Sequence, residues 1–276
     1  AKNMSYKRNL GVKKYKSNIV SFLDSDAYPP KNWLKIANNF LIKKKNKKII
    51  FGGPSIPFPK QTYGEMLCHY AKRSFFVTGY LNFRKFKSKK RTCDWLESCN
   101  MFIKRELYLK HGGMDLNKYL GEDKEFFERI KRKDTSIRVI YTSKIFIYHK
   151  ERNIKKFLMQ RTVFGSDLFN IIKFGNNIRS YQPILPLLVL TIFFLILSLE
   201  IDLNIKIMLI STYLLFTQFL ILLNIQKYLK NINIIISTLI LINLANLVYA
   251  IGNIFAITGL KNFFNRKVYL KSRSNK

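Results

Sequence analysis

The feature that most constrains this chain is an abrupt change in the distribution of apolar residues near Ser180. Before that point apolar and charged residues alternate, as they do in a water-exposed domain. Beyond it three nearly continuous apolar stretches cover residues 184–199, 205–225 and 232–259. A bilayer-spanning helix needs about 20 apolar residues, and each stretch approaches or exceeds that length. We therefore divide the chain into residues 1–180, a membrane region at 181–260 and a basic tail at 261–276.

The charges between the apolar stretches predict an orientation. Glu200 and Asp202 lie in the first connection, whereas Lys227 and Lys230 lie in the second. Cytoplasmic loops carry an excess of Lys and Arg, so the second connection and the basic N-terminal part are expected on the cytoplasmic side of the inner (plasma) membrane, in a multi-pass protein. A third crossing would place the basic tail outside. We therefore predict two crossings, with the third stretch interfacial or re-entrant.

The net charge of +33 raises nucleic acid as a partner. However, the basic residues are mostly lysines scattered among apolar residues and asparagines, without an Arg-rich helix, so we predict no nucleic-acid binding. Anionic lipid headgroups and phosphate-bearing substrates fit this charge better. The three cysteines, Cys68, Cys93 and Cys99, have neither a disulfide-framework nor a CxxC spacing and are interpreted as ordinary thiols in a reducing compartment.

The N-terminal part has the pattern of an α/β domain, with strands alternating with helices. Strands are predicted at residues 19–23, 49–51, 100–103, 138–141 and 144–148. Helices are predicted at residues 33–41, 62–77, 105–110 and from residue 122, with a basic loop at 82–91. Residues 153–174 have helical amphipathic spacing. That helix is expected either in the membrane interface or packed on the soluble core.

Two carboxylates follow the first apolar strand. Asp24 and Asp26 come directly after residues 19–23, so both are expected at the carboxyl end of that strand, where α/β sheets bind ligands. Two oxygen ligands suit Mg²⁺ or Mn²⁺, which retain open positions for phosphate oxygens. Such an ion would offset the charge that develops on a departing nucleotide. The competing interpretation is an ordinary polar turn.

A second acidic group lies where a loop enters a helix, at Gly121, Glu122 and Asp123. Acids at a helix N-terminus interact favourably with the helix dipole and need no further role. The functional interpretation makes Asp123 a general base that accepts a proton from an acceptor hydroxyl. Sequence leaves both interpretations open.

Three further polar residues are candidates. His149 closes a predicted strand and is either structural or a metal ligand. Gln160 and Arg161 lie on the predicted amphipathic helix, where the guanidinium could bind a diphosphate. The alternative for this pair is a solvated basic face.

Several of these motifs occur in an order and spacing that resembles the family 2 glycosyltransferases. The matching segments are residues 7–11, 19–26, 52–54, 98–103, 112–113, 121–126, 148–149, 160–161 and 165, within residues 7–175. The apolar tail, with residues 249–252 near its end, is similar to membrane-bound bacterial members that build cell-surface polysaccharide or glycolipid.

This resemblance implies a GT-A fold and an inverting transfer from a nucleotide-sugar donor to a lipid-linked or polysaccharide acceptor, with membrane lipids as further partners. It implies a site with Asp123 as the base, Asp24, Asn100, Glu122, Gln160 and Arg161 binding substrate, and Asp26, Asp24 and His149 holding Mg²⁺ or Mn²⁺. Gln160 and Arg161 match the Gln-x-x-Arg-Trp pattern of processive synthases only loosely, so processivity is not expected.

The front of the chain departs from the family, whose members begin with a strand–helix–strand unit that holds the nucleotide base. We therefore expect a partial GT-A domain, incomplete at its N-terminus. This departure supports a second hypothesis, an inactive membrane-associated remnant of such an enzyme. A third hypothesis, a small transporter or pore, would require Asn243, Asn246 and Asn253 to line a path across the apolar stretches.

Overall fold

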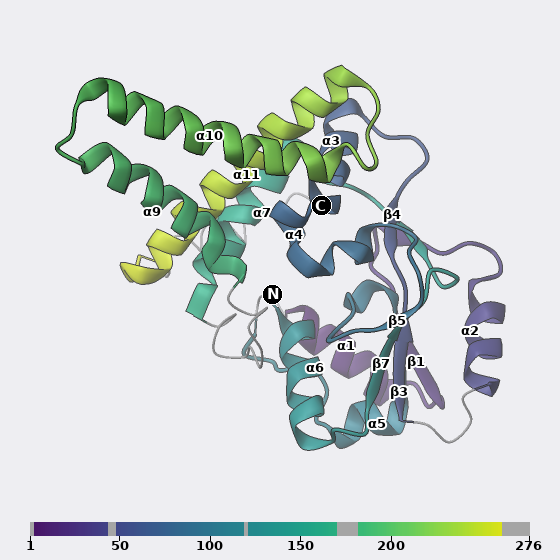
Figure 1. Cartoon of the computed structure of the whole chain (residues 1–276). Coiled ribbons are helices and arrows are strands. Elements are labelled where there is room, and N and C mark those ends of the chain that lie inside the picture. Colours follow the sequence, from purple (N-terminus) through teal and green to yellow (C-terminus); the bar gives the residue numbers. More distant parts are fainter. Residues whose placement is uncertain (1–2, 44–47, 119–120, 170–181, 261–276) are drawn as a thin grey trace. The chain divides into compact units, whose positions relative to one another are not determined.

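A computed structural model describes residues 3–43, 48–118, 121–169 and 182–260 (Figure 1). The chain divides into two compact units. The first unit consists of Ala1–Lys60 and Phe83–Lys150, and the second of Gln61–Asn82 and Glu151–Lys276. The second unit thus groups two segments of the N-terminal part with the apolar C-terminal helices. The predicted domain boundary near Ser180 and the basic tail lie outside the described residues.

The first unit is a mixed α/β structure, as the sequence predicted. Its helices are α1 (Met4–Lys14), α2 (Trp33–Ile42), η2 (Ser98–Asn100), α5 (Arg105–Lys110) and α6 (Glu122–Lys133). Its strands are β1 (Ile19–Phe22), β2 (Ala27–Tyr28), β3 (Ile49–Gly52), β4 (Ser55–Pro57), β5 (Arg91–Thr92), β6 (Met101–Lys104), β7 (Arg138–Tyr141) and β8 (Ile147–His149). Five strands form one sheet in the order β1-β6-β3-β7-β5, in which only β3 and β7 are parallel. The other three form a small sheet in the order β2-β8-β4.

Helices cover both faces of the larger sheet (Figure 1). On one face, α2 packs through Trp33 on Phe102, and Phe102 stacks on Phe51 with ring centroids 5.0 Å apart. On the other face, Tyr108 of α5 contacts Phe22 of β1. Because alternate strand residues face opposite sides, these side chains fill two separate layers. Each aromatic pair adds about 0.5–1.5 kcal/mol beyond the area that it buries.

Helix α1 is the main element of this unit that the sequence did not predict. It is strongly basic and buries only Ser5 and Val12, so it lacks the apolar face by which helices are recognised. Its first turn is capped by Asn3, whose Oδ1 accepts a hydrogen bond from the Tyr6 amide at 2.9 Å. Strands β2, β4 and β5 were also missed, because two or three residues are too few to show a period.

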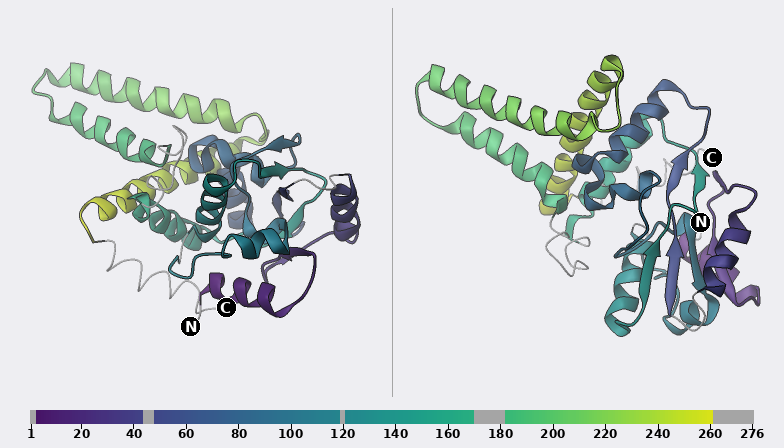
Figure 2. Two further views of the ribbon diagram at one scale, coloured as in Figure 1. Left: turned by 90° about the horizontal axis from the view of Figure 1, so that it is seen from below. Right: turned by 45° about the vertical axis from the view of Figure 1, so that its right-hand side comes forward.

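The second unit is helical. It contains α3 (Tyr63–Arg73), α4 (Phe75–Thr78), α7 (Ile154–Ser166), α9 (Leu185–Ser198), α10 (Leu203–Ile225) and α11 (Ile232–Ile257), and η1 (Gly79–Lys85) leads from it to the first unit. The single helix predicted at residues 62–77 is two helices, because Ser74 is extended and caps α4 through its hydroxyl. Residues 82–91, predicted to be a loop, begin inside η1. Figure 2 shows α9 and α10 as a hairpin beside α11.

Helix α7 packs closely against α11. A Cβ atom on Gly165 would overlap the carbonyl oxygen of Tyr249, and one on Gly252 would overlap that of Thr162. These two glycines let the backbones approach as small residues do in membrane helix pairs. The predicted amphipathic helix at 153–174 therefore has an apolar helix as its partner over its described residues.

Helices α10 and α11, with 23 and 26 residues, are long and apolar enough to cross a membrane. Among the described residues, α9 is a shorter apolar helix of 14 residues, or about 21 Å. The three apolar stretches therefore differ in helix length, while the predicted number of crossings stays a prediction. The third stretch, predicted to be the interfacial or re-entrant one, forms the longest helix, and the first stretch forms the shortest.

Two asparagines of the third stretch join helices to other segments. Asn243 of α11 and Gln218 of α10 exchange two side-chain hydrogen bonds of 2.7 and 3.1 Å. Asn253 donates a hydrogen bond to the carbonyl of Pro183. Inter-helix hydrogen bonds of this kind hold apolar helices together. These contacts give Asn243 and Asn253 a packing role and supply no support for the pore hypothesis.

Candidate active site

The first unit places Asp24 and Asp26 at the tip of β1, as predicted. The turn is closed by a hydrogen bond from the Ala27 amide to the Asp24 carbonyl, and β2 follows directly. Strand β2 pairs with β8, so that Ala27 lies opposite His149. This pairing brings His149 to the two carboxylates. Its Nε2 lies 3.6 Å from Asp24 Oδ2 and 3.7 Å from Asp26 Oδ1.

These contacts shift the protonation of the cluster. Burial alone would raise the pKa of Asp24, but interactions with His149 and Arg8 hold it below its ordinary value. Burial opposes a charge on His149, yet Asp24 and the Lys150 carbonyl together raise the pKa of the imidazole. The cluster therefore favours ionised Asp24 beside His149.

The donor set of this cluster fits a divalent ion. The ligand atoms of Asp24, His149 and Cys99 all lie within 4.8 Å of one another. Burial, with the charges of nearby carboxylates, holds the pKa of the Cys99 thiol well above its ordinary value, so it is a poor ligand. Carboxylate oxygens and an imidazole nitrogen remain as the donors, a set suited to Mg²⁺ or, because of the imidazole, to Mn²⁺. The sequence did not predict that Cys99 lies here.

The second acidic group lies at the start of α6. Gly121 has φ of +65°, a left-handed conformation that glycine adopts at little cost, and it is the N-cap residue without a side-chain cap. Asp123 is half-buried, and its carboxylate accepts hydrogen bonds from the amides of Lys124 at 2.8 Å and Ser98 at 3.4 Å. The contact with Ser98, 25 residues away, exceeds what helix capping requires.

Burial and the neighbouring charge of Glu122 raise the pKa of Asp123 to about 7. Arg8 and Arg84 act in the opposite direction, with smaller effects. A carboxyl group that ionises near neutral pH can accept a proton during a reaction more effectively than one of ordinary pKa. The site thus contains two kinds of carboxylate, with the pKa of Asp24 lowered and that of Asp123 raised.

Arg8 of α1 connects the two acidic groups. Its Nη1 lies 2.8 Å from Glu122 Oε1, and its Nη2 lies 3.2 Å from Asp24 Oδ1. Cys99 supplies a second connection, because it follows Ser98, the partner of Asp123, and faces Asp24. Asp24 and the α6 turn therefore share one neighbourhood. A pocket of about 470 Å³ between α1 and β1 opens beside Arg8 and Asp24.

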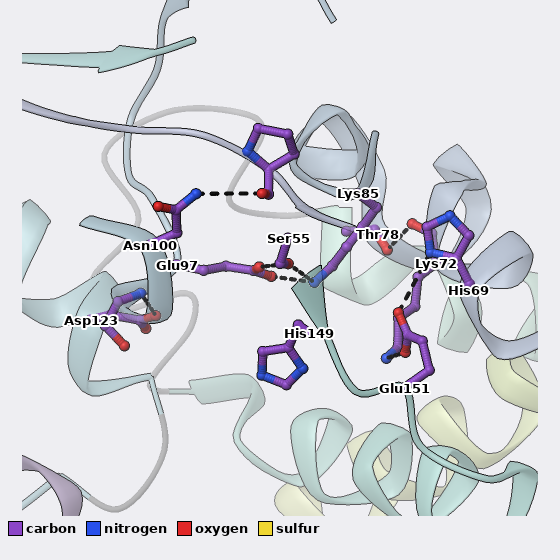
Figure 3. A network of polar contacts seen from close by, with 12 residues as sticks. Ser55, His69, Lys72, Thr78, Lys85, Glu97, Asn100, Asp123, His149 and Glu151 are labelled. Carbon is purple, nitrogen blue, oxygen red and sulfur yellow. Dashed lines mark hydrogen bonds and ion pairs between the residues drawn. The ribbon is translucent and has the colours of Figure 1, made fainter. Parts of the chain in front are cut away.

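Figure 3 shows a further polar group of the first unit. Lys85 Nζ lies 2.6 Å from Glu97 Oε1, and the Ser55 hydroxyl donates to the other oxygen of Glu97 at 2.5 Å. Burial would raise the pKa of Glu97, but Lys85 and Arg84 lower it to about 2. Glu97 directly precedes Ser98, whose amide donates to Asp123. The contacts of ionised Glu97 with Lys85 and Ser55 therefore hold this segment in place.

Asn100, a predicted substrate-binding residue, is fully buried. Its oxygen accepts from the Trp33 indole at 3.2 Å, and its nitrogen donates to the carbonyls of Ile145 and Pro54. Figure 3 shows the contact with the Pro54 carbonyl. With both ends of the amide occupied by the protein, Asn100 connects α2, η2 and the loop before β8. The structure gives it a scaffold role.

Gln160 and Arg161 belong to the second unit, on α7. Both are half-buried, and the Arg161 guanidinium stacks 4.2 Å from the centre of the Tyr249 ring on α11. Figure 3 also includes a buried ion pair of this unit, between Lys72 and Glu151, which joins α3 to the segment before α7.

No family model and no curated protein matches this sequence. Among solved structures, the chain is similar to S. aureus TarS, with 13% identity and a TM-score of 0.36 over 74% of this chain. It spans about a third (34%) of that TarS chain. A structure of TarS 1-349 in complex with UDP-GlcNAc gives 13% identity and a TM-score of 0.37, covering 94% of this chain and 73% of that one. Similarity at this level leaves the function to be argued from the residues of the chain itself.

Proposed function

We propose that this protein transfers a sugar from a nucleotide-diphosphate donor to an acceptor hydroxyl, with its first unit as part of a GT-A-type catalytic domain. The observation that carries the proposal is the pairing of two carboxylate groups of opposite pKa shift in one neighbourhood. Asp24, with Asp26 and His149, forms a site for a cation, and Asp123 is suited to accept a proton. In enzyme sites where the pKa values of two carboxyl groups are shifted in opposite directions, one group stabilises charge and the other performs acid–base chemistry.

In this proposal Asp26, Asp24 and His149 hold Mg²⁺ or Mn²⁺. The ion would neutralise charge on the diphosphate of the departing nucleotide. His149 is oriented for this role by its Nδ1, which lies 2.9 Å from the Lys150 carbonyl and leaves Nε2 facing the carboxylates.

Asp123 acts as the general base in the proposed reaction. The acceptor oxygen forms a bond to the anomeric carbon, the bond from that carbon to the diphosphate oxygen breaks, and the hydroxyl proton passes to the Asp123 carboxylate. One displacement at the carbon inverts its configuration. The hydrogen bonds from the Ser98 and Lys124 amides hold the carboxylate in place during the transfer.

We propose a lipid-linked or cell-surface polysaccharide acceptor at the inner membrane, with catalysis on the cytoplasmic side. The membrane part of this proposal is supported by two helices long enough to cross a bilayer, and α10 carries large exposed apolar side chains such as Leu215 and Phe216. Gln160 and Arg161 are proposed to bind a phosphate-bearing substrate, since a guanidinium is a strong anion ligand.

Nucleotide release by purified protein in detergent or membranes, with a panel of nucleotide sugars and Mn²⁺, tests the proposal. We expect Asp123→Asn and Asp26→Asn to lower release at least about 100-fold, a size typical of lost acid–base groups. Glu106→Gln, which removes an exposed carboxylate on α5, is the matched control and should keep full activity. Unchanged turnover in both site variants would reject the assigned roles. No release by the wild-type protein with any donor would favour the alternative, an inactive remnant.

A further inference from the structure

Helix α1 contributes the cation that joins the two halves of the proposed site. Arg8 contacts Asp24 from the β1 tip and Glu122 from the α6 turn, which lie 98 positions apart in the sequence. The two contacts use different nitrogen atoms of one guanidinium group. A planar, forked cation can bind two carboxylates in fixed directions at once.

The surroundings of Arg8 restrict its motion. Its side chain is 9% exposed, and the guanidinium lies 6.0 Å from the centre of the Phe22 ring and 3.7 Å from the sulfur of Met114. A charge this far removed from water is stable only while its partners remain in place. Arg8 is therefore held by β1 and by the segment before α6.

The next residue of α1 fixes that segment directly. Asn9 donates to the Met114 carbonyl at 2.7 Å and accepts from the Met114 amide and the Tyr108 hydroxyl. Gly113 has a left-handed conformation, and a Cβ atom there would press on the Asn9 side chain. Two adjacent residues of one helix thus hold the chain at Met114 and again at Glu122.

We propose that Arg8 is a positioning residue that sets the distance and orientation between the Asp24 cluster and the α6 turn that carries Asp123. This inference rests on the proposed function, because the two groups must face the same reacting centre. Without the guanidinium, the carboxylates of Asp24 and Glu122 would face each other without a cation between them. Their repulsion would move the turn away from β1 and displace Asp123 from the acceptor.

An Arg8 that only added stability would behave differently from one that positions Asp123. A positioning residue alters the chemical step while donor binding changes little, and it acts through its partner. Lysine, a compact cation on a flexible stem, can satisfy one carboxylate but not both in fixed directions. The separate effects on kcat and on donor KM, together with the Arg8→Lys variant, therefore distinguish a positioning role from a purely stabilising one.

The test compares Arg8→Gln and Arg8→Lys with Lys13→Gln, which removes an exposed positive charge from the same helix. With the nucleotide sugar that the wild-type protein uses best, we expect kcat to fall about 10- to 100-fold in Arg8→Gln, as for other partners that orient reacting groups, with donor KM within about threefold. Arg8→Lys should recover part of the loss, and Lys13→Gln should match the wild type.

A double-mutant cycle identifies the partner. If Arg8 acts through Glu122, the loss in Arg8→Gln/Glu122→Gln is smaller than the product of the two single losses. Losses that multiply would show that Arg8 does not act through Glu122, and a rise in KM at constant kcat would make Arg8 a donor contact; either result would overturn the proposal.

Hydrogen–deuterium exchange provides a readout that does not depend on activity. Amides at the start of α6 should exchange faster in Arg8→Gln than in the wild type or Lys13→Gln, because local opening of the turn becomes easier. Unchanged exchange there would refute the positioning role. If the wild-type protein transfers no sugar but Arg8→Gln still exchanges faster at the start of α6, the result would contradict the proposed function and support the structural role of Arg8.

Discussion

The raised pKa of Asp123 predicts a pH dependence with a definite sign. A general base must be ionised, so kcat/KM should increase with pH and level off above the pKa of the base. Burial and the charge of Glu122 place that pKa at about 7 rather than at the ordinary 3.8. At pH 6 about one tenth of a group with pKa 7 is ionised, and at pH 8 about nine tenths. We expect kcat/KM to rise about tenfold over this interval.

The raised pKa of Asp123 makes the stability of the folded protein decrease with pH, whereas the activity increases. The folded protein holds the Asp123 proton more tightly than the unfolded chain does, so the contribution is favourable below pH 3.8 and is lost as the pH rises through about 7. A pKa change from 3.8 to about 7 corresponds to at most about 4 kcal/mol, and the partial exposure of the group reduces that value. Asp123→Asn should therefore be inactive but more stable than the wild type at pH 8, with the difference vanishing at low pH.

The assay is nucleotide release between pH 5.5 and 9, together with thermal unfolding of the wild type and Asp123→Asn at several pH values. The pKa of His149 is also raised, so ionisation of this residue could produce a change in nucleotide release within the same pH range. The profile is therefore repeated in His149→Gln, where the rise with pH should persist at lower absolute rate. A flat wild-type profile between pH 6 and 8, or a rise that disappears with His149, would refute the assignment of Asp123 as the base.

Three other substitutions test the scaffold. Gly165→Ala should separate α7 from α11 and lower unfolding stability by about 2 kcal/mol or more in a detergent-based assay, because the added methyl overlaps a backbone carbonyl; Gly64→Ala, where a Cβ meets only ordinary contacts, should not. Asn100→Ala should cost about 1–3 kcal/mol in chemical unfolding, since it leaves a buried indole N–H unpaired, and equal stability would contradict this reasoning. Asn243→Leu should cost about 0.6–2 kcal/mol in mixed micelles, and less when Gln218 is also replaced by Leu.

Local pattern was sufficient for much of the fold. The strand before Asp24, the helix after the paired prolines and the helix beginning at Glu122 were all predicted, because each depends on a short run of apolar spacing with a clear stop signal. Helix α1 was missed because it is basic on nearly every face. The lengths of the apolar helices were not predicted, because composition shows hydrophobicity, whereas helix length depends on where each helix is capped, as by Asp202 and Asn231.

The candidate site, like the fold, has features that the sequence predicted and features that only the structure revealed. The acidic residues were identified in advance, since carboxylates beside strand ends and helix starts stand out in a one-dimensional pattern. Their relation to one another was implied only by the family resemblance, because it depends on the pairing of β2 with β8, on the Ser98 amide and on Arg8. Asn100 illustrates the reverse error: its place within a motif suggested a ligand contact, but its amide is occupied by the core.

From the amino-acid order alone come the mixed α/β character of the N-terminal part, the apolar C-terminal helices and the kinds of chemical group available. These follow from interactions between residues close together in the chain. The protonation of Asp24 and Asp123 and the connection between them come only from the folded molecule. The physical reason is that a pKa reflects burial and nearby charge, and these depend on folding, which buries Asp123 and brings His149 and Arg8 to Asp24 and Arg8 to Glu122.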